Sequence, residues 1–433
     1  MTKKKAFGFW SAIFLGIGSM VGAGIFIVIG EAGAIAGKLV IFSFLIAGII
    51  ALLCGYSLAK LAITYPSRGG IIEYLVQSYK EGYFSGSLGV LFYFAQLVAL
   101  AAVSKSFGTY AATYISSEES LFWTNLFALG ILGFFVLINL IGASMVAKSE
   151  SLIVLIKVSV LIIFTVAALV YIDPSKLLSS HTTSSINIFY TLGLTFFAYQ
   201  GFSVITNSIE DMENPKKVML FSMITAIIIV TILYIAITIA VFGNLTLNEI
   251  IKSQDFALAE AAKPAFGTLG FKIIAATALF ATASAINATL YSVTQISYVL
   301  AKNGELPKIY EHNIFHNSEG LIISALLIVP MILFLNLGTI ASIAAVTVLL
   351  IQGLTHAGHL LKLKETGANP VIVILAVIGT FGAAGFAIYY SSQHTAHFTL
   401  YVTIVFFLAF AVEVALQLFT QRKITKQFIS SEE

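Results

Sequence analysis

The first apolar segment of the chain contains Gly16-Ile17-Gly18-Ser19-Met20-Val21-Gly22-Ala23-Gly24-Ile25-Phe26. Four of its first nine positions are glycine, and each glycine costs roughly 1 kcal/mol relative to alanine in a helix interior. In lipid, the backbone groups freed by an interruption find no water, so an interruption persists only where it faces protein or a polar cavity. The stretch therefore predicts a broken helix beside a cavity near the middle of a membrane.

The composition excludes a soluble protein. Of the 433 residues, 59% are hydrophobic and 10% are charged. Apolar runs of about 17 to 25 residues are typical of transmembrane helices, and longer runs are read as tilted or broken ones. The chain has twelve such runs, at residues 9–36, 39–64, 84–114, 121–142, 147–171, 186–210, 217–243, 270–301, 319–336, 338–358, 369–391 and 397–419. The first run is too long and too rich in glycine for a cleaved signal, so we expect it to remain in the mature protein.

Basic residues predict the orientation of these spans. Sixteen Lys and Arg residues fall on the side of the N-terminus, and five fall on the opposite side. Because short cytoplasmic loops retain positive charge, both termini are expected in the cytoplasm, which agrees with an even number of spans. The remaining two basic residues, Lys105 and Lys157, fall inside predicted spans. The net charge of +3 thus reflects membrane topology and does not indicate a nucleic-acid partner.

No separate soluble domain is visible in the sequence. The single cysteine, Cys54, lies in the second span, so a disulfide within the chain is excluded and a small buried side chain is expected there. The fold predicted from this pattern is an all-α polytopic membrane protein with twelve transmembrane helices.

A second interruption is predicted in span six. This span reads Tyr190-Thr191-Leu192-Gly193-Leu194-Thr195-Phe196-Phe197-Ala198-Tyr199-Gln200-Gly201-Phe202-Ser203. Interrupted helices at corresponding positions of two halves are typical of inverted-repeat transporters, which hold their ligand where the two breaks meet. The alternative is that these glycines only allow close helix packing, as small residues often do in membranes.

Four groups of residues carry a resemblance to the amino acid–polyamine–organocation (APC) family. They are Gly18 to Phe26, Tyr65-Pro66-Ser67-Arg68-Gly69-Gly70, Gly201-Phe202 with Glu213-Asn214-Pro215-Lys216-Lys217, and Leu300-Ala301-Lys302-Asn303-Gly304-Glu305-Leu306-Pro307. The resemblance covers nearly the whole chain. It implies a LeuT-like fold of 5+5 inverted helices, broken in helices 1 and 6, with a first repeat at residues 1–171, a second at 172–358, and two further helices with a cytoplasmic tail at 359–433.

The resemblance also implies a site for an amino acid. Backbone N–H groups of Gly22, Ala23 and Gly24 would bind the substrate carboxylate, which the positive end of a helix also favours. Carbonyl groups near Met20, Phe197 and Gln200 would bind its ammonium. The side chains that would bound the variable group are Phe197, Tyr199 and Gln200, with Gly201 and Ser203 beside them.

The expected substrate is a neutral amino acid. Some members of the family have a glutamate two residues after the glycine of the sixth helix, where this chain has Ser203. No Asp or Glu falls near the middle of the first ten predicted spans. A cationic side chain would therefore lack a counter-charge, and burying an unpaired charge is costly.

Lys157 is the predicted coupling group. Lys148 lies at the predicted cytoplasmic edge of the fifth span, and Lys157 follows it by nine residues, or about 13 Å of helix. A lysine side chain can hardly reach the membrane surface from this depth. Its ammonium must therefore find partners inside the bundle or lose its proton. Within the family the likeness is to proton-dependent, sodium-independent transporters of broad specificity, and it rests on Lys157, Lys105 and the stretch from Ala257 to Pro264. It implies that Lys157 takes the place of a sodium ion, near the Gly18 carbonyl and Ser284, with Thr282 as a further partner. The alternative is a charged lysine that pins helices and never titrates.

Other ionisable residues of the predicted spans are expected to have structural roles. Lys105 is expected to pin helices or to reach the lipid interface, and Glu413 of the twelfth span is expected to be peripheral. His356 and His359 have a spacing that could share a metal, but no third ligand stands beside them, so we expect no metal site. The sequence has no nucleophile arrangement or phosphate loop, so neither an enzyme nor a bound cofactor is predicted, the proton being the only coupling ion.

The sequence leaves three functions open. The first is proton-coupled amino acid symport, and the second is exchange of one amino acid for another or for a polyamine through the same two breaks. The third is a channel or a transporter-like sensor, although no filter motif or ring of like charge is evident. The expected partners are the substrate and membrane lipid, with no obligatory protein partner. The expected location is the cytoplasmic membrane of a prokaryote.

Overall fold

The structure is a computed structural model that describes residues 8–67, 69–115, 120–141, 146–178, 183–212, 214–314 and 317–420. Some residues used in the sequence predictions lie outside these ranges, namely Lys3, Lys4, Lys5, Arg68, Glu213, Arg422, Lys423 and Lys426. Within the described ranges the protein is helical almost throughout. The exception is a two-residue antiparallel pair, β1 (Asn313–Ile314) and β2 (Asn317–Ser318).

The first predicted repeat contains seven α-helices and one 3₁₀ turn. They are α1 (Phe9–Met20), α2 (Ala23–Ala36), η1 (Gly37–Leu39), α3 (Val40–Thr64), α4 (Ile71–Tyr79), α5 (Tyr83–Ala112), α6 (Leu121–Ile141) and α7 (Val146–Val170). The predicted break in the first span is present, because α1 ends at Met20 and α2 begins at Ala23. The glycine-rich stretch is therefore where the helix stops.

The second predicted repeat contains the divided sixth span. Its elements are α8 (Pro174–Leu178), α9 (Asn187–Tyr190), α10 (Leu192–Ala198), η2 (Phe202–Asp211), α11 (Pro215–Asn244), α12 (Leu247–Lys252), η3 (Gln254–Phe256), α13 (Ala257–Glu260), α14 (Lys263–Asn303), η4 (Lys308–Glu311), α15 (Glu319–Phe334) and α16 (Leu337–Leu360). Span six is interrupted after Ala198 and continues as a 3₁₀ helix. The chain ends with α17 (Leu363–Thr366), α18 (Pro370–His394) and α19 (Phe398–Thr420).

Nine helical segments of the described ranges are long and apolar enough to cross a membrane. The sequence predicted twelve spans. The difference arises because α2 and α3 join into one segment through η1, span six is divided into short pieces, and α15 has only 16 residues. The structure thus shows a polytopic membrane protein, and the count of twelve stays a prediction.

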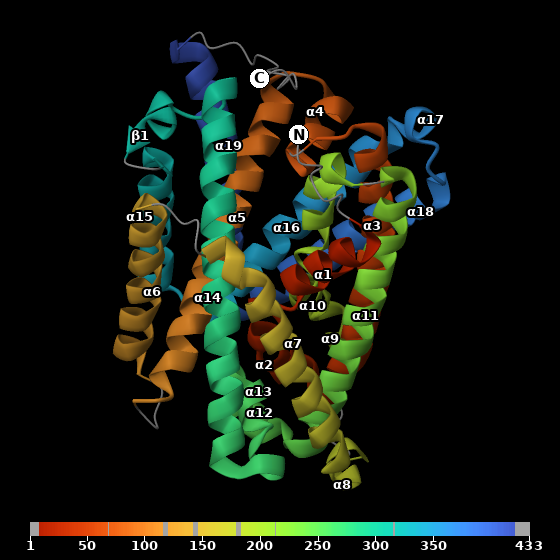
Figure 1. Cartoon of the computed structure of the whole chain (residues 1–433), viewed down its shortest axis with the longest axis vertical. Coiled ribbons are helices and arrows are strands. Elements are labelled where there is room, and N and C mark those ends of the chain that lie inside the picture. Colours follow the sequence, from red (N-terminus) through yellow and green to blue (C-terminus); the bar gives the residue numbers. More distant parts are fainter. Residues whose placement is uncertain are drawn as a thin grey trace.

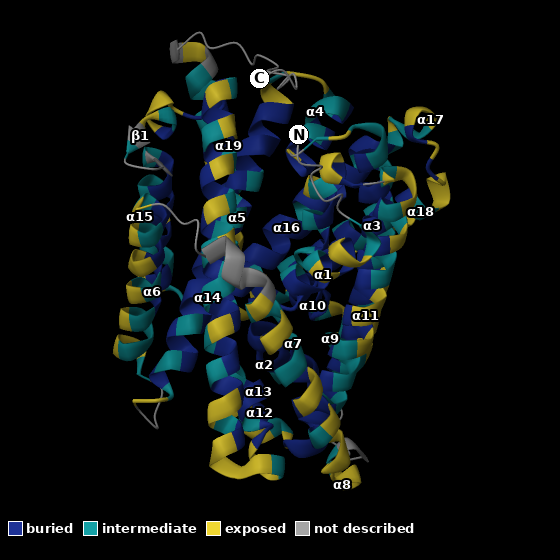
Figure 2. Ribbon diagram, in the orientation of Figure 1, coloured by how far each residue is buried: buried dark blue, intermediate teal, exposed yellow. Residues whose placement is uncertain are grey.

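The core lies around α5 and α16, which are mostly buried, whereas α6, α18 and α19 expose much of their surface (Figure 2). α16 packs against α18 and α5, and α3 packs against α11. Figure 1 places α4, α17 and β1 at one end of the molecule and α8, α12 and α13 at the other. The pieces α1 and α10 end in the middle, so both interruptions lie halfway along the molecule (Figure 1).

Candidate functional site

The two interruptions lie against each other. A Cβ atom added to Gly24 would lie 2.8 Å from the Cα of Ala198, and one added to Gly201 would lie 2.7 Å from the carbonyl carbon of Ser19. Contacts this short between backbones require glycine on one side. The glycines of both stretches therefore serve to bring the two broken helices together.

The first interruption exposes a helix N-terminus. Val21 and Gly22 have non-helical backbone angles, and the Gly22 N–H donates to the Met20 carbonyl at 2.8 Å. Among the described residues, no side chain caps the N-terminus of α2, a helix of 14 residues. The first N–H groups of such a helix carry partial positive charge and suit an anion. Gly22, Ala23 and Gly24 lie at the start of α2, and their role in binding a carboxylate stays a prediction.

The second interruption begins at the C-terminal end of a helix. α10 ends at Ala198, and Gly201 has a φ of 119°, in the region that glycine adopts readily. The N–H groups of Tyr199 and Gln200 fold back to the carbonyls of Phe196 and Phe197 at 3.0 Å each. The C-terminal end of a helix carries partial negative charge, which suits an ammonium group.

Tyr234 of α11 joins the two interruptions. Its hydroxyl lies 2.8 Å from the Met20 carbonyl and 3.0 Å from the Ala198 carbonyl. The side chain is fully buried, and its ring packs against Phe44 and Tyr199. Sequence reasoning missed this residue. The signal was available, since Tyr234 is the aromatic residue of a run that is otherwise aliphatic apart from Thr231, namely Ile227-Ile228-Ile229-Val230-Thr231-Ile232-Leu233-Tyr234-Ile235.

The predicted side chains of span six take different positions. Tyr199 is fully buried, and its hydroxyl donates to the Phe44 carbonyl of α3 at 2.9 Å. Phe197 is buried as well, whereas Gln200 and Ser203 are half-buried beside Gly201. The structure brings all of these residues to the second interruption.

Lys157 reaches the first broken helix from α7. Its side chain is buried, and Nζ donates to the Gly18 carbonyl at 2.9 Å. This carbonyl belongs to the last turn of α1, where carbonyl groups lose their helical partners. Of the other residues predicted here, the Thr282 hydroxyl donates to the Ala278 and Leu279 carbonyls of its own helix, and Ser284 is half-buried on α14.

The other buried lysine lies elsewhere. Lys105 Nζ donates to Asn125 Oδ1 of α6 at 2.6 Å and to the Ile332 carbonyl in the last turn of α15 at 2.7 Å. It joins three helices, in the manner expected of a helix-pinning lysine. The two lysines make similar bonds to helix C-termini, but only Lys157 does so at an interruption.

Three acids are buried away from the interruptions. Glu31 of α2 packs against Gly338 at the start of α16. Glu413 of α19 lies over Gly86 of α5, and Glu305, just beyond the end of α14, lies over Gly89. Glu413, expected to be peripheral, is fully buried in this packing. Burial and the charge of Glu413 raise the pKa of Glu305 to about 8.

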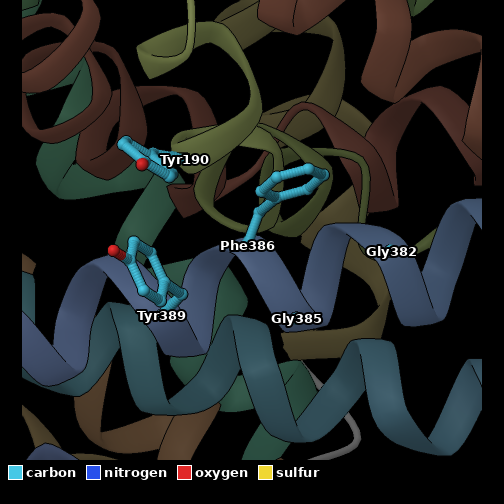
Figure 3. A pocket seen from close by; sticks show the side chains of 5 residues that line it. All are labelled: Tyr190, Gly382, Gly385, Phe386 and Tyr389. Carbon is cyan, nitrogen blue, oxygen red and sulfur yellow. The ribbon is translucent and has the colours of Figure 1, made fainter.

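A pocket of about 490 Å³ opens beside α18 (Figure 3). Tyr190, Gly382, Gly385, Phe386 and Tyr389 line it, and none of them belongs to the predicted site. Tyr389 is 58% exposed, so the pocket belongs to the outer surface of the helix bundle.

The fold and site define an almost entirely helical membrane protein with two broken helices that present opposite helix ends to each other. The model of the family described as amino acid permease matches residues 7–426, and the chain belongs to this family. It is 34% identical over 431 residues to an uncharacterized protein of Methanocaldococcus jannaschii, covering 99% of this chain and 98% of that one.

Two further relatives have names that describe transport. The inner membrane transport protein YbaT of Escherichia coli is 36% identical over 350 residues, covering 80% of this chain and 81% of YbaT. The serine/threonine exchanger SteT of Bacillus subtilis is 27% identical over 309 residues, covering 70% of each chain. The family and these relatives are transporters and not enzymes, so the protein is an amino acid transporter embedded in a membrane.

Proposed function

We propose that the protein moves neutral amino acids of several sizes across the cytoplasmic membrane by sodium-independent, proton-coupled symport. The observation that carries the proposal is the pair of facing interruptions together with Lys157. A ligand with a carboxylate and an ammonium group matches the N-terminus of α2 and the carbonyl end of α10. Because every α-amino acid has both groups, backbone contacts of this kind tolerate many side chains.

The first proposed step is binding between the interruptions. The N–H groups of Gly22, Ala23 and Gly24 bind the carboxylate, and carbonyls near Met20, Phe197 and Gln200 bind the ammonium. The side chains of Phe197, Tyr199 and Gln200, with Gly201 and Ser203, bound the variable group. The Met20 carbonyl accepts from Tyr234 and from the Gly22 N–H. In the bound state the Gly22 N–H leaves this oxygen for the carboxylate, and the ammonium takes its place beside the Tyr234 hydroxyl.

A neutral substrate fits the charges around the breaks. Residues 16–26 and 190–203 contain no Asp or Glu. The acid that follows on α2, Glu31, packs against Gly338 of α16. A cationic side chain bound here would remain unpaired, which is costly in a low-dielectric site.

Lys157 is the proposed coupling group. Protonated, it donates to the Gly18 carbonyl and braces α7 against the end of α1. Without its proton, the amine loses the positive charge that strengthens this bond, and α1 is released. Ser284 and Thr282 complete the environment of the ammonium in this proposal. A lysine in this place supplies the positive charge that a sodium ion would otherwise bring, so no metal ion is required.

We also propose the arrangement and orientation of the spans. The chain has twelve spans in a LeuT-like arrangement, with repeats at residues 1–171 and 172–358 and two further helices at 359–433. Both termini lie in the cytoplasm, so α4 and α17 lie at the cytoplasmic end of the molecule. This orientation is supported by the sixteen basic residues on that side against five on the other.

The test is uptake of labelled alanine into sodium-free proteoliposomes under an inward proton gradient. Wild type is expected to accumulate alanine with the gradient. Lys157→Ala is expected to lose this accumulation while retaining alanine counterflow, which needs no proton coupling. Proton-stimulated uptake by Lys157→Ala with an unchanged pH profile would contradict the role of this lysine.

Lys105→Ala is the matched control. It also removes a buried lysine that bonds a carbonyl near a helix C-terminus, but this carbonyl belongs to α15 and not to either interruption. It is expected to lower thermal stability and to leave proton-driven uptake per folded protein unchanged. Equal loss of coupling in both variants would show that Lys157 acts only by pinning helices.

The second candidate function is exchange, which the similarity to the exchanger SteT favours. An exchanger would use the same two interruptions and would leave Lys157 protonated throughout. Vesicles without internal amino acid separate the two functions. Uptake that occurs only after preloading with amino acid would establish exchange and rule out symport.

A further inference from the structure

One face of α18 has large side chains at both ends and only glycine in between. Every third or fourth residue from 375 to 389 lies on this face, and these residues are Leu375, Ile378, Gly382, Gly385 and Tyr389. All of them are exposed. A Cβ atom added to either glycine would meet no atom within 4 Å among the described residues. The two glycines therefore leave a hollow in the outer surface of the bundle.

Aromatic rings from two helices form the walls of this hollow. The pocket of about 490 Å³ lies here (Figure 3), with the rings of Tyr190 from α9 and of Phe386 and Tyr389 from α18 around the two glycines. The ring centroid of Tyr190 lies 6.4 Å from that of Phe386 and 5.9 Å from that of Tyr389. The five lining residues are all uncharged. The pocket, which we call the α18 pocket, thus suits an apolar ligand.

The α18 pocket extends from the middle of a membrane span toward one end. Gly382 lies midway between Pro370 and His394, the two ends of α18. Tyr389 is about 8 Å from the His394 end at 1.5 Å per residue. Tyrosine is enriched where lipid meets water, and Figure 3 shows both tyrosine hydroxyls at the end of the pocket away from Gly382. The glycine floor therefore lies deep in the bilayer, and the hydroxyl groups lie nearer to its surface.

This order of groups matches a membrane lipid better than a second helix. An apolar cavity of about 150 Å³ binds benzene, so the α18 pocket has room for roughly three times as many carbons, which is the size of one acyl chain. Glycines favour helix association when they let two backbones approach closely. The exposed rings of Phe386 and Tyr389 stand beside Gly385 and would hold a second backbone away. A flexible acyl chain can bend around them.

We propose that the α18 pocket binds one acyl chain of a phospholipid. The acyl chain lies over Gly382 and Gly385 and against the ring of Phe386. Its ester carbonyl accepts hydrogen bonds from the hydroxyls of Tyr190 and Tyr389, because a carbonyl oxygen can only accept. The phospholipid headgroup then lies at the membrane surface beyond these two tyrosines.

The bound phospholipid would link α18 to a broken helix. α9 leads into α10, the piece of span six that ends at the second interruption. A Cβ atom on Gly193 of α10 would lie 2.7 Å from the Cβ of Ala387 on α18, so the two helices touch next to Phe386. The acyl chain extends this contact along the outer surface. Lipid binding here does not depend on the coupling ion, so it applies to a symporter and to an exchanger alike.

Native mass spectrometry tests the proposal on the whole protein released from nanodiscs of palmitoyl-oleoyl phosphatidylglycerol. Wild type is expected to retain one phospholipid after the other lipids have left. Gly382→Leu fills the hollow and replaces glycine by a better helix former, so it should fold and lose this phospholipid. Gly133→Leu is the matched control, because Gly133 is exposed on α6 and a Cβ there would also meet no atom within 4 Å among the described residues.

Three results of this experiment would overturn the proposal. They are a wild type that retains no phospholipid, equal retention by wild type and Gly382→Leu, and equal loss in Gly382→Leu and Gly133→Leu. A dimer that Gly382→Leu dissociates, without a retained phospholipid, would assign the face to a second copy of the protein instead.

Melting temperatures in detergent test the position of the ester. A ligand that binds only the folded protein stabilises it. Added ester-linked phosphatidylglycerol is expected to raise the melting temperature of wild type more than that of Tyr190→Phe/Tyr389→Phe. An ether-linked analogue, which lacks the carbonyl groups, should act equally on both. Tyr390→Phe is the control, because Tyr390 packs against Tyr190 but does not line the pocket. Equal responses of wild type and the double variant to the ester-linked lipid would overturn the placement of the ester.

Discussion

The two interruptions differ in how the helix resumes. After Val21 and Gly22 the first helix continues as 14 residues of α-helix, whereas after Gly201 the second continues as a 3₁₀ helix of 10 residues. A 3₁₀ helix has poorer hydrogen-bond geometry, and long runs of it often mark a hinge. The first interruption is therefore suited to hold a carboxylate firmly, and the second is suited to change shape.

The largest expected effect comes from the second interruption. Gly201→Ala combines a φ of 119° with a Cβ atom 2.7 Å from the Ser19 carbonyl carbon, so both the backbone and the opposing helix would have to move. We expect alanine uptake to fall to background. Gly385→Ala, where a Cβ would meet no atom within 4 Å among the described residues, should leave uptake unchanged. Near-normal uptake by Gly201→Ala would show that the two breaks need not touch.

A smaller loss is expected at the first interruption. In Gly24→Ala the new Cβ would lie 2.8 Å from the Cα of Ala198, while in Gly22→Ala the nearest atom would be 3.5 Å away. We expect kcat/KM for alanine to fall at least about tenfold in Gly24→Ala and much less in Gly22→Ala. Equal losses in the two variants would place the cause in helix propensity and not in the contact between the interruptions.

Removing the bridge between the interruptions should have a moderate effect. Tyr234→Phe keeps the ring but removes the hydroxyl from the Met20 and Ala198 carbonyls. The Met20 carbonyl keeps the Gly22 N–H as a donor, so the expected cost is that of one buried unpaired acceptor, about 1–3 kcal/mol. We expect KM for alanine to rise by roughly tenfold, with a smaller change in kcat. Tyr199→Phe, whose hydroxyl bonds Phe44 of α3 instead, should raise KM less. The reverse order would locate the substrate nearer to α3.

The smallest effect on transport is expected far from both interruptions. The pKa of Glu305 is raised from 4.5 to about 8 in the folded protein, chiefly by burial. A raised carboxyl pKa favours the folded state at low pH, and this contribution is lost as pH rises from about 4.5 through about 8. The melting temperature in detergent should fall over this range in wild type and stay flatter in Glu305→Gln, with alanine uptake unchanged. A parallel fall in Glu305→Gln would assign the pH dependence to other groups.

Glycine and hydropathy patterns were sufficient to predict a helical polytopic membrane protein and the two breaks, whereas the count of twelve spans stays a prediction. The C-terminus of α1 and the N-terminus of α2 fall within the glycine-rich stretch from Gly16 to Phe26, and α10 ends three residues before Gly201. These features depend on local sequence. A glycine weakens a helix at any interior position, and a long apolar run must be buried in lipid or in the protein core. The contact of Lys157 with Gly18 was also predicted, but only through the family resemblance.

Contacts between residues that are distant in the sequence could not be predicted from these local patterns. Glu413 was expected to be peripheral, yet it is buried over Gly86, a residue more than 300 positions earlier. The role of Tyr234 and the contacts of the Ser57 hydroxyl with His356 and His359 were also missed. The reason is physical. Sequence determines where a helix stops and which side chains can be buried. Only the packing of helices decides which carbonyl, hydroxyl or carboxylate each of those side chains meets.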